Sequence, residues 1–412
     1  MTKADKEGQR KTPILRFKGF TDDWEQRELN EVTTRVLRKN KNLISKRPLT
    51  ISAQYGLIDQ QAFFNKQVAS SNLENYLLLE KGEFAYNKSY SDGFPYGTIK
   101  KLNLYGNGAV STLYIAFKAN ADINSDFLEN LFSSNKWHNE VYKIAAEGAR
   151  NHGLLNISPD DFFNIKITIS KDSQEQSFIS KFLRIFDNLL ALYAKKSSCL
   201  DSCIAYFIRT FYDYQQFFKQ KNVQSSIVKS FKLNDILIKN NIRNKDSSIL
   251  NVESISNKEG FISQKKQFDN YQVASKDLSN YYVIHPKDFA YNPSRINVGS
   301  IAYKNPNDVK GIVSPLYVSF KCKNDIILDK YLWYWFKSAN FEHQRVRLSE
   351  GGVRDTLSFN QLSKMKISIP SFEIQKQTIK FLEILIQYKE EIDLKLNNLK
   401  LIKNTLLQNM FL

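Results

Sequence analysis

The chain has 412 residues, of which 42% are hydrophobic and 13% aromatic, and its formal net charge is +17. This length is enough for two domains that each bury a core, and no run of about 20 apolar residues predicts a transmembrane helix. The excess positive charge indicates nucleic acid or an anionic surface as the partner, although charge alone also fits a basic protein with neither.

The first part of the chain reads as a mixed α+β body. Short β-branched or alternating runs at residues 48–52, 97–99 and 109–117 are broken by turn residues, which predicts strands. Apolar residues recur at helical spacing near residues 126–146. We therefore predict a first α+β domain over residues 16–170, with most of its aromatic residues in the core.

A long helix is predicted next, over residues 171–227. No proline occurs between Pro159 and Pro286, and no glycine between Gly153 and Gly260. Apolar positions three and four apart form a loose heptad seam. Its members are Phe178, Phe182, Ile185, Leu189, Leu192, Lys196, Leu200, Cys203, Phe207 and Phe211.

Cysteine usage and the first residues of the chain bear on the compartment. Three cysteines, a low and odd number, indicate a reducing cytoplasm, and residues 1–7 are not followed by the apolar core of a signal peptide. Cys199 and Cys203 lie four residues apart on the predicted helix. No second Cys or His pair lies nearby, so we expect buried residues of a coil and no metal site.

The second part of the chain repeats this plan. A strand is predicted at residues 312–318, helical spacing recurs near 329–347, and together they indicate a second α+β domain over residues 228–370. Residues 371–412 contain neither glycine nor proline and predict another long helix. Its heptad seam consists of Leu382, Leu385, Lys389, Ile392, Leu396, Leu399, Lys403, Leu406 and Met410.

Neither long helix is expected to be stable alone, because each would expose one apolar stripe to water. Each helix must therefore pack on the other or on a partner. Because the two occupy equivalent places in the repeat, we predict that they pair as an intramolecular antiparallel coiled coil. An ordinary core helix is the alternative for either one taken singly.

An internal duplication supports this division. Glu83–Ser89 returns as Asp288–Ser294 with five of seven residues identical, and Leu29–Val32 returns as Leu233–Ile236. Three further matches keep the same order, namely Ser111–Tyr114 with Ser314–Tyr317, Ile165–Ile169 with Met365–Ile369, and Lys181–Leu183 with Lys380–Leu382. A period of about 200 residues is too long for a solenoid unit. Two similar domains on one chain suggest a ligand that is contacted twice.

Motifs for catalysis are absent from the sequence. There is no Asn/Asp-Pro-Pro-aromatic motif of amine methyltransferases, no Gly-x-Gly-x-x-Gly after a strand, and no phosphate loop. Asp160-Asp161 and Asp308–Lys310 come nearest to the carboxylates of a metal nuclease. The four histidines are too scattered for a zinc site or a triad, at His138, His152, His285 and His343. We predict that this chain is not an enzyme.

Several segments carry a resemblance to a known family. One is Arg16–Glu25, with the sequence RFKGFTDDWE, which is followed by the Leu-Asn-Glu-Val element. Another is Gly82–Ser89, together with its repeat in the second half of the chain. Gly351-Gly352-x-Arg354 leads to Ile367–Pro370 and then to Gln375. Over almost its whole length the chain resembles the specificity subunit of type I restriction–modification enzymes. It departs from the family where Ser170 follows Ile169, since the family usually has proline there.

The resemblance implies a function. Residues 16–170 and 228–370 would be target-recognition domains, each reading one half of a bipartite, asymmetric site in double-stranded DNA. Residues 171–227 and 371–412 would be the conserved helical spacer, which docks two methyltransferase (modification) subunits. This chain would bind no cofactor, because S-adenosylmethionine, ATP and Mg²⁺ belong to the methyltransferase and the restriction or translocase subunits. No membrane partner is expected.

Candidate DNA-contacting residues are those that differ within the shared frame or that carry charge beside it. Gly56 and Gly260 close equivalent loops whose polar residues differ. The candidates are Ser52, Gln54, Tyr55, Lys88, Ser89, Arg150, Ser256, Lys258, Ser294, Arg295 and Arg354. Each of them also fits a solvated or fold-supporting role. Two other functions stay open at this point, an unrecognised nuclease and a coiled-coil adaptor that binds an acidic protein.

Overall fold

The computed structural model describes nine stretches of the chain: 11–52, 55–64, 72–89, 93–145, 155–220, 228–257, 259–264, 277–348 and 356–412. For residues 211–220 it describes the backbone alone. The chain divides into two compact units. The first extends to Ala194 and also takes in Leu394–Leu412, and the second is Lys195–Asp393. Two long helices contribute to both units, α7 (Ser173–Gln220) and α13 (Phe372–Met410).

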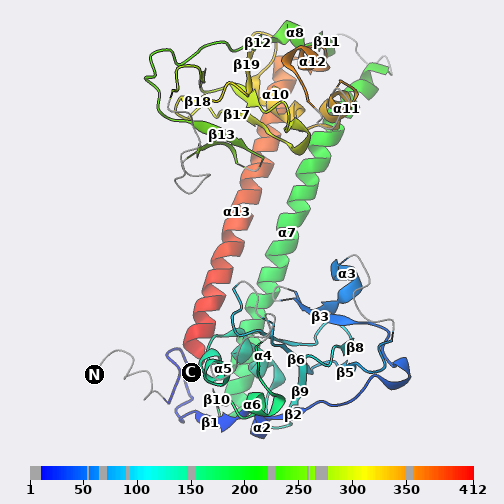
Figure 1. Cartoon of the computed structure of the whole chain (residues 1–412), viewed down its shortest axis with the longest axis vertical. Helices are drawn as coiled ribbons and strands as arrows, with labels where there is room; N and C mark the ends of the chain where they lie inside the picture. Colours follow the sequence, from blue (N-terminus) through cyan, green and yellow to red (C-terminus); the bar gives the residue numbers. More distant parts are fainter. Residues whose placement is uncertain are drawn as a thin grey trace. The chain divides into compact units, whose positions relative to one another are not determined.

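The first unit contains a four-stranded antiparallel sheet and three two-stranded pairs (Figure 1). The sheet has the order β2 (Thr33–Arg35), β9 (Ile115–Ala119), β6 (Phe84–Asn87) and β7 (Thr98–Lys101). The pairs are β1 (Glu25–Glu28) with β10 (Lys166–Ile169), β3 (Leu49–Ser52) with β4 (Gly56–Asp59), and β5 (Leu77–Glu80) with β8 (Asn107–Val110). The shorter helices are α2 (Leu29–Val32), η1 (Lys41–Leu43), α3 (Gln60–Phe64), α4 (Ser125–Ser133), α5 (His138–Ala145) and α6 (Pro159–Phe163).

The second unit repeats this topology strand for strand. Its sheet has the order β12 (Leu237–Lys239), β19 (Val318–Cys322), β16 (Phe289–Tyr291) and β17 (Ile301–Tyr303). The pairs are β11 (Val228–Lys232) with β20 (Lys366–Pro370), β13 (Glu253–Ser256) with β14 (Gly260–Ser263), and β15 (Tyr282–Ile284) with β18 (Gly311–Val313). The shorter helices are α8 (Leu233–Ile236), η2 (Ile296–Val298), α10 (Asp329–Trp335), α11 (Ala339–Leu348) and α12 (Phe359–Ser363). The predicted duplicated α+β architecture is confirmed.

The repeated Phe-Ala-Tyr motif forms the central strand of each sheet. Phe84 stacks on Phe117 of the neighbouring strand with ring centroids 5.1 Å apart, and Phe289 stacks on Phe320 at 5.2 Å. The motif tyrosines are fully buried and donate their hydroxyls to backbone carbonyls, at 2.8 Å from Tyr86 and 3.0 Å from Tyr291. Burial raises the pKa of both tyrosines, so they remain neutral donors. The strongest repeat in the sequence therefore encodes core packing.

The fourth residue of each long helix is a glutamine in both copies. The Gln176 side chain donates to the Ser170 carbonyl at 2.8 Å and accepts from the Asn124 amide at 2.9 Å. Gln375 donates to the Pro370 carbonyl at 3.0 Å and accepts from the Leu328 amide at 2.8 Å. Both glutamines are buried, and each ties the end of a strand to a neighbouring helix. Ser170 thus replaces the proline of the family without changing how the first helix begins.

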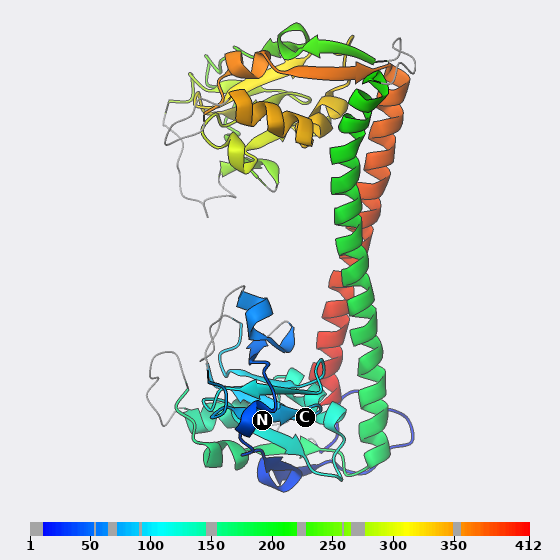
Figure 2. The same cartoon turned by 90° about the vertical axis from the view of Figure 1, so that its right-hand side faces the viewer.

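The two long helices run antiparallel within each unit. In the first unit Lys403 of α13 forms an ion pair with Asp187 of α7. In the second, Lys389 lies 3.4 Å from Asp201, and the Ser197 hydroxyl donates to Asp393 at 2.5 Å. Residue numbers therefore rise along α7 as they fall along α13. In both views the α13 segment of each unit lies beside its α7 segment (Figures 1 and 2).

The predicted seam of α13 matches the buried face of that helix, whereas the seam of α7 requires correction. Leu382 and Ile392 are fully buried, and Leu385, Leu396 and Leu399 are half-buried. On α7, Phe182 and Leu189 are half-buried, but Ile185 and Leu192 are 55% and 59% exposed. The buried face of α7 instead includes Ile179 and Leu183.

Cys199 and Cys203 lie on the same outer side of α7 and are exposed, so the expectation that they are buried is wrong. The physical reason is that α7 carries two overlapping three-and-four patterns, one residue apart. Packing selects only one of these patterns. No described helix of the chain is long and apolar enough to cross a membrane.

The core of the first unit is completed by the last turns of α13. Trp24, Phe84 and Phe127 form one buried cluster with Leu407 and Phe411. Trp24 and Phe127 both contact the Phe411 ring, with centroids 6.1 Å and 5.2 Å apart. Residues almost 400 positions apart in the sequence therefore share one core.

Candidate nucleic-acid interface

Equivalent hairpins carry the first group of predicted site residues. Ser52 pairs with Gly56 across the β3–β4 turn, and Ser256 pairs with Gly260 across the β13–β14 turn. The two glycines have φ of +80° and +74°, a left-handed conformation that favours glycine. Each serine hydroxyl accepts a turn amide, from Tyr55 at 3.2 Å and from the equivalent residue at 3.3 Å. Ser52 and Ser256 therefore hold the turn.

The side chains at the two turns differ while the frame is the same. Tyr55 is 60% exposed, and Glu259 is exposed at the equivalent position of the second unit. Gln54 and Lys258 lie outside the described residues. A common backbone that presents an aromatic ring in one copy and a carboxylate in the other fits a surface whose contacts differ between the copies.

Each hairpin extends toward the connection that follows the central strand. In the second unit a Cβ placed on Gly260 would lie 3.8 Å from Ala302 in the middle of β17, while Lys304, past the end of β17, bonds to Glu253 at the start of β13. The hairpin tip is therefore at the end of β17 that adjoins residues 292–300. This brings the second group of candidates to the same end of the body as the first.

The turn after the central strand has the same geometry in both units. The Ser89 amide donates to the Asn87 side chain at 3.1 Å, and the Ser294 amide donates to Asn292 at 3.1 Å. Ser294 and Arg295 are exposed, and among the described residues no group pairs with the Arg295 guanidinium. These two residues are free to contact a ligand.

The remaining charged candidates from the sequence are Lys88, Arg150 and Arg354. The Lys88 ammonium is half-buried and donates to the Ile157 carbonyl at 2.8 Å, and burial lowers the pKa of Lys88. The Lys88 carbonyl also accepts from the Leu155 amide at 3.0 Å, so the contacts of Lys88 support the fold. Arg150 and Arg354 lie outside the described residues.

A basic segment that the motif comparison missed follows β2. Residues 32–58 contain no acidic side chain but six basic ones, at Arg35, Arg38, Lys39, Lys41, Lys46 and Arg47. Lys41 and Lys46 are exposed, while Arg47 covers the ring of Tyr105 at 4.2 Å. In the second unit Arg243 covers Tyr282 at 4.0 Å. The signal was available in the sequence as an uninterrupted basic run, which is typical of a phosphate-binding surface.

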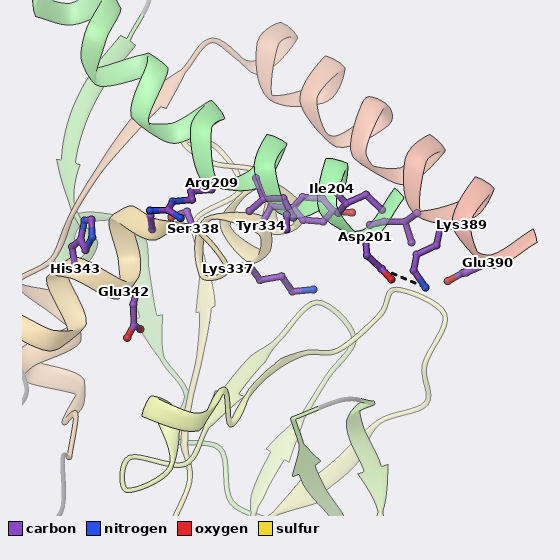
Figure 3. Close-up of a pocket in the computed structure, with 14 residues that line it drawn as sticks. Asp201, Ile204, Arg209, Tyr334, Lys337, Ser338, Glu342, His343, Lys389 and Glu390 are labelled. Carbon is purple, nitrogen blue, oxygen red and sulfur yellow. Dashed lines mark ion pairs between the residues drawn. The ribbon is translucent and has the colours of Figure 1, made fainter. Parts of the chain in front are cut away.

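A second candidate surface is a groove in the second unit, with a volume of about 800 Å³ (Figure 3). Ile204 and Ile208 of α7, Tyr334 of α10 and Ile386 of α13 supply apolar side chains, and Lys337 extends away from the long helices (Figure 3). The Lys337 ammonium lies 4.3 Å from the Trp333 ring, and burial lowers its pKa. Arg209 also lines the groove, and neither cation has a carboxylate partner among the described side chains. Asp201, Glu342 and Glu390 also line it, so the groove combines apolar walls with charges of both signs.

The outer face of α7 presents an apolar row. Ile185, Leu192, Cys199 and Tyr206 are all exposed and lie seven residues apart. This spacing places the four side chains along one line of the helix, at a single position of the heptad, and α13 does not cover them. The row is therefore available to another helix.

The described residues show no catalytic constellation. Among them, no group of three or more His, Cys, Asp or Glu side chains could hold a metal ion. Asp160 and Asp161 lie in the first turn of α6, where the Ser158 hydroxyl caps the helix. Asp308 accepts from the Asn305 amide at 2.9 Å in a turn. These carboxylates stabilise local backbone.

Comparison with known proteins finds a family match that includes the second body. Residues 225–401 match the family model described as type I restriction modification DNA specificity domain. This segment is therefore similar to the type I specificity domain. The match agrees with the resemblance predicted from the sequence motifs. The first body has the same strand order as the second. No curated protein matches the sequence of this chain.

Solved structures are similar in fold to this chain. The S subunit of a type I restriction-modification system from M. genitalium is 14% identical, with 97% of this chain and 99% of that chain covered and a TM-score of 0.54. A chain from a structure describing complex assembly and conformational transition of the type I R-M system is also 14% identical. It covers 93% of this chain and 96% of its own length with a TM-score of 0.54.

Proposed function

We propose that this chain is the sequence-reading subunit of a type I restriction–modification complex. Its two bodies, residues 16–170 and 228–370, each bind one half of a split, asymmetric site in double-stranded DNA. The observation that carries this proposal is the pair of equivalent hairpins that present different side chains on one frame, Tyr55 in the first and Glu259 in the second. Unequal copies read unequal half-sites.

The charge of the chain supplies the sequence-independent part of binding. A net charge of +17 attracts the phosphate backbone, and the basic segment after β2 concentrates that attraction on the first body. Side chains at the hairpin tips and after the central strands, such as Tyr55 and Arg295, supply discrimination between bases. The affinity for DNA should therefore fall with rising salt while the preferred sequence stays the same.

The long helices dock the other subunits in this proposal. Two methyltransferase subunits bind the helical segments 171–227 and 371–412, and the apolar row on α7 gives one of them a helix-binding face. Replacing Ile185 and Leu192 by Asp should abolish co-purification of the methyltransferase, whereas Asn188→Asp on the same helix should not. Retained co-purification of the first variant would remove α7 as a docking face.

Catalysis belongs to the partners in this proposal. The methyltransferase subunits supply S-adenosylmethionine, the restriction subunits supply ATP-driven translocation with Mg²⁺, and this chain carries none of these cofactors. The purified chain should show no methyl transfer by itself. Methyl transfer by the isolated chain would contradict the proposal.

Exchange of one body tests the central claim. Residues 228–370 are replaced by the equivalent body of another specificity subunit, and methylated sites are mapped in cells that express the methyltransferase. One half of the site should change and the other half should persist. The reciprocal exchange of residues 16–170 is the matched control and should change the other half. A change in both halves from a single exchange would contradict independent reading.

A second candidate is an adaptor that binds an acidic protein, for which Arg209 and Lys337 of the groove would supply the positive charge. The two functions differ in their response to DNA. An adaptor would bind duplex DNA of any sequence equally, and its affinity would depend on salt alone. Sequence preference that persists at high salt would exclude it.

A further inference from the structure

A buried ion pair joins the hairpin of the second body to its sheet. The Lys304 ammonium donates to both carboxylate oxygens of Glu253, at 2.8 Å and 2.6 Å. Lys304 is 1% exposed and Glu253 is 7% exposed. Glu253 begins β13 and also accepts from the Asn251 side chain at 3.0 Å. The pair thus links the base of the β13–β14 hairpin to the residue that follows β17.

The first body has leucine at both positions. The Leu102 amide donates to the Glu83 carbonyl as the Lys304 amide donates to that of Asp288, so Leu102 and Lys304 are equivalent. Leu49 begins β3 as Glu253 begins β13, and it lies in one buried cluster with Leu102. Both members of the contact differ together between the two copies, an apolar pair in one and an ion pair in the other.

The surroundings leave little room for another arrangement. A Cβ on Gly311 would meet the Glu253 carboxyl carbon at 2.6 Å, and a Cβ on Gly108 would meet a Leu49 methyl at 2.2 Å. Each glycine therefore admits the side chain at the base of its hairpin. The Lys304 ammonium also lies 5.2 Å from the ring of Phe261 on β14, so it contacts both strands of the hairpin.

We propose that Lys304 and Glu253 are positioning residues for DNA recognition, which fix the β13–β14 hairpin on β17 so that its tip and the Ser294–Arg295 turn read bases together. The inference rests on the proposed function. The ion pair is directional and requires both partners at hydrogen-bond distance, whereas the leucine contact of the first body tolerates sliding. The second hairpin is therefore held in one register against the sheet. The pair also leaves the tip side chains exposed for the ligand.

The test uses the full chain with its methyltransferase partner and four variants. Lys304→Met leaves the Glu253 carboxylate buried without its cation. The double variant E253L/K304L installs the leucine pair of the first body. Glu253→Lys with Lys304→Glu reverses the pair, and Lys321→Met removes an exposed lysine from the same sheet as the matched control. Hydrogen exchange of the β13–β14 amides and methylation of duplexes with single-base changes in either half-site are measured for each.

Lys304→Met should speed exchange of the hairpin amides at least tenfold, since an uncompensated buried charge is strongly destabilising. It should also reduce discrimination at one half-site by about tenfold and leave the other half-site unchanged. The double leucine variant should restore hairpin exchange to within about threefold, because apolar residues of similar volume replace a buried ion pair with little loss. Discrimination should stay reduced in this variant, because the leucine contact tolerates sliding. Lys321→Met should match the wild type in both.

The outcomes separate this inference from the function on which it rests. Equal loss at both half-sites, or no change in hairpin exchange, would overturn the positioning role. Faster exchange that the leucine pair rescues, with discrimination unaltered at both half-sites, would overturn it as well. Failure of the wild-type complex to methylate or bind any specific duplex would instead overturn the proposed function. The hairpin readout in the free chain does not depend on DNA.

Discussion

Phe84 and Phe289 are equivalent, but the edge-strand residues that pair with them differ: Lys101 in the first sheet and Tyr303 in the second. Both are buried polar side chains. In the first body Lys101 forms ion pairs with Asp126 and with Glu129, the latter at 2.8 Å. In the second body Tyr303 donates its hydroxyl to Asp329 at 2.8 Å, and burial together with this hydrogen bond raises the pKa of Tyr303. Each edge strand thus reaches a carboxylate on the following helix through a different chemical group.

The comparison shows which features a duplicated fold must keep. Backbone hydrogen bonds, strand register and the buried glutamines at the helix starts are the same in both copies. Contacting side chains differ between the copies: ion pairs of Lys101 replace the Tyr303 hydrogen bond at one place, and two leucines replace the Glu253–Lys304 ion pair at another. Pairs can change because the loss of one partner alone leaves a buried group unsatisfied. The following predictions test this distinction, from the largest expected effect to the smallest.

Replacing Glu175 should produce the largest difference in stability between the two bodies. Glu175 is fully buried and accepts from Arg16 at 2.6 Å, Trp24 at 3.0 Å and Ser170 at 2.5 Å, whereas Ile374 occupies the equivalent position in the second copy. Glu175→Ala should lower the free energy of opening of the first body by about 3–5 kcal/mol, since Arg16 loses its partner. Hydrogen exchange resolved by residue measures this. Equal destabilisation of the second body would contradict the assignment.

Leucines at the equivalent helix positions should behave alike. Leu183 and Leu382 are fully buried, and truncating either to Ala should cost about 2–5 kcal/mol in its own body. Ile185→Ala is the control from the exposed face and should change stability by less than about 0.5 kcal/mol. Stability is followed by exchange of the helix amides. A large effect of Ile185→Ala would restore the seam predicted from the sequence.

The two glutamines should show matched effects. Gln176→Ala and Gln375→Ala each remove one donated and one accepted hydrogen bond from a buried site. Each should cost about 1–3 kcal/mol, because a buried backbone group loses its partner. Unequal losses of stability in the two bodies would contradict an equivalent role for the two glutamines.

The smallest expected effect concerns pH. Burial raises the pKa of Asp288 above its usual value of 3.8. The folded state therefore binds this proton more strongly than the unfolded state, so stability is lost as pH rises from 3.8 through the folded pKa. Asp288→Asn still accepts from the His285 amide and should remove this dependence. Unfolding of the second body measured across that pH range checks the sign, and an unchanged slope would contradict it.

Several features of this fold were predictable because they are local. The Phe-Ala-Tyr repeat predicted equivalent strands, and the α13 seam was correct because its leucines form a single three-and-four pattern. The α7 seam was misplaced at Ile185 and Leu192 because two such patterns overlap there, and only packing against α13 selects between them. The exposed Cys199 and Cys203 followed from the same rotation of the helix.

The candidate interface was predictable in outline and less so in detail. Equivalent loops at Gly56 and Gly260 marked the hairpins, because a left-handed glycine leaves a clear signal. The role of Lys88 was not apparent, since its partner Ile157 lies far along the chain. The Glu253–Lys304 pair was hidden for the same reason, as 51 residues separate its members. Long-range pairing of this kind has no periodicity from which to infer it.

The closure of the first core by Leu407 and Phe411 has a consequence for synthesis. Domains generally fold as they leave the ribosome, in order from the amino end. Here the first body to emerge lacks part of its core until the whole second body has been translated. During that interval Trp24 and Phe127 have no cover from Phe411. A ribosome that stalls within residues 228–370 would leave a nascent first domain with an open apolar face, which a chaperone must shield.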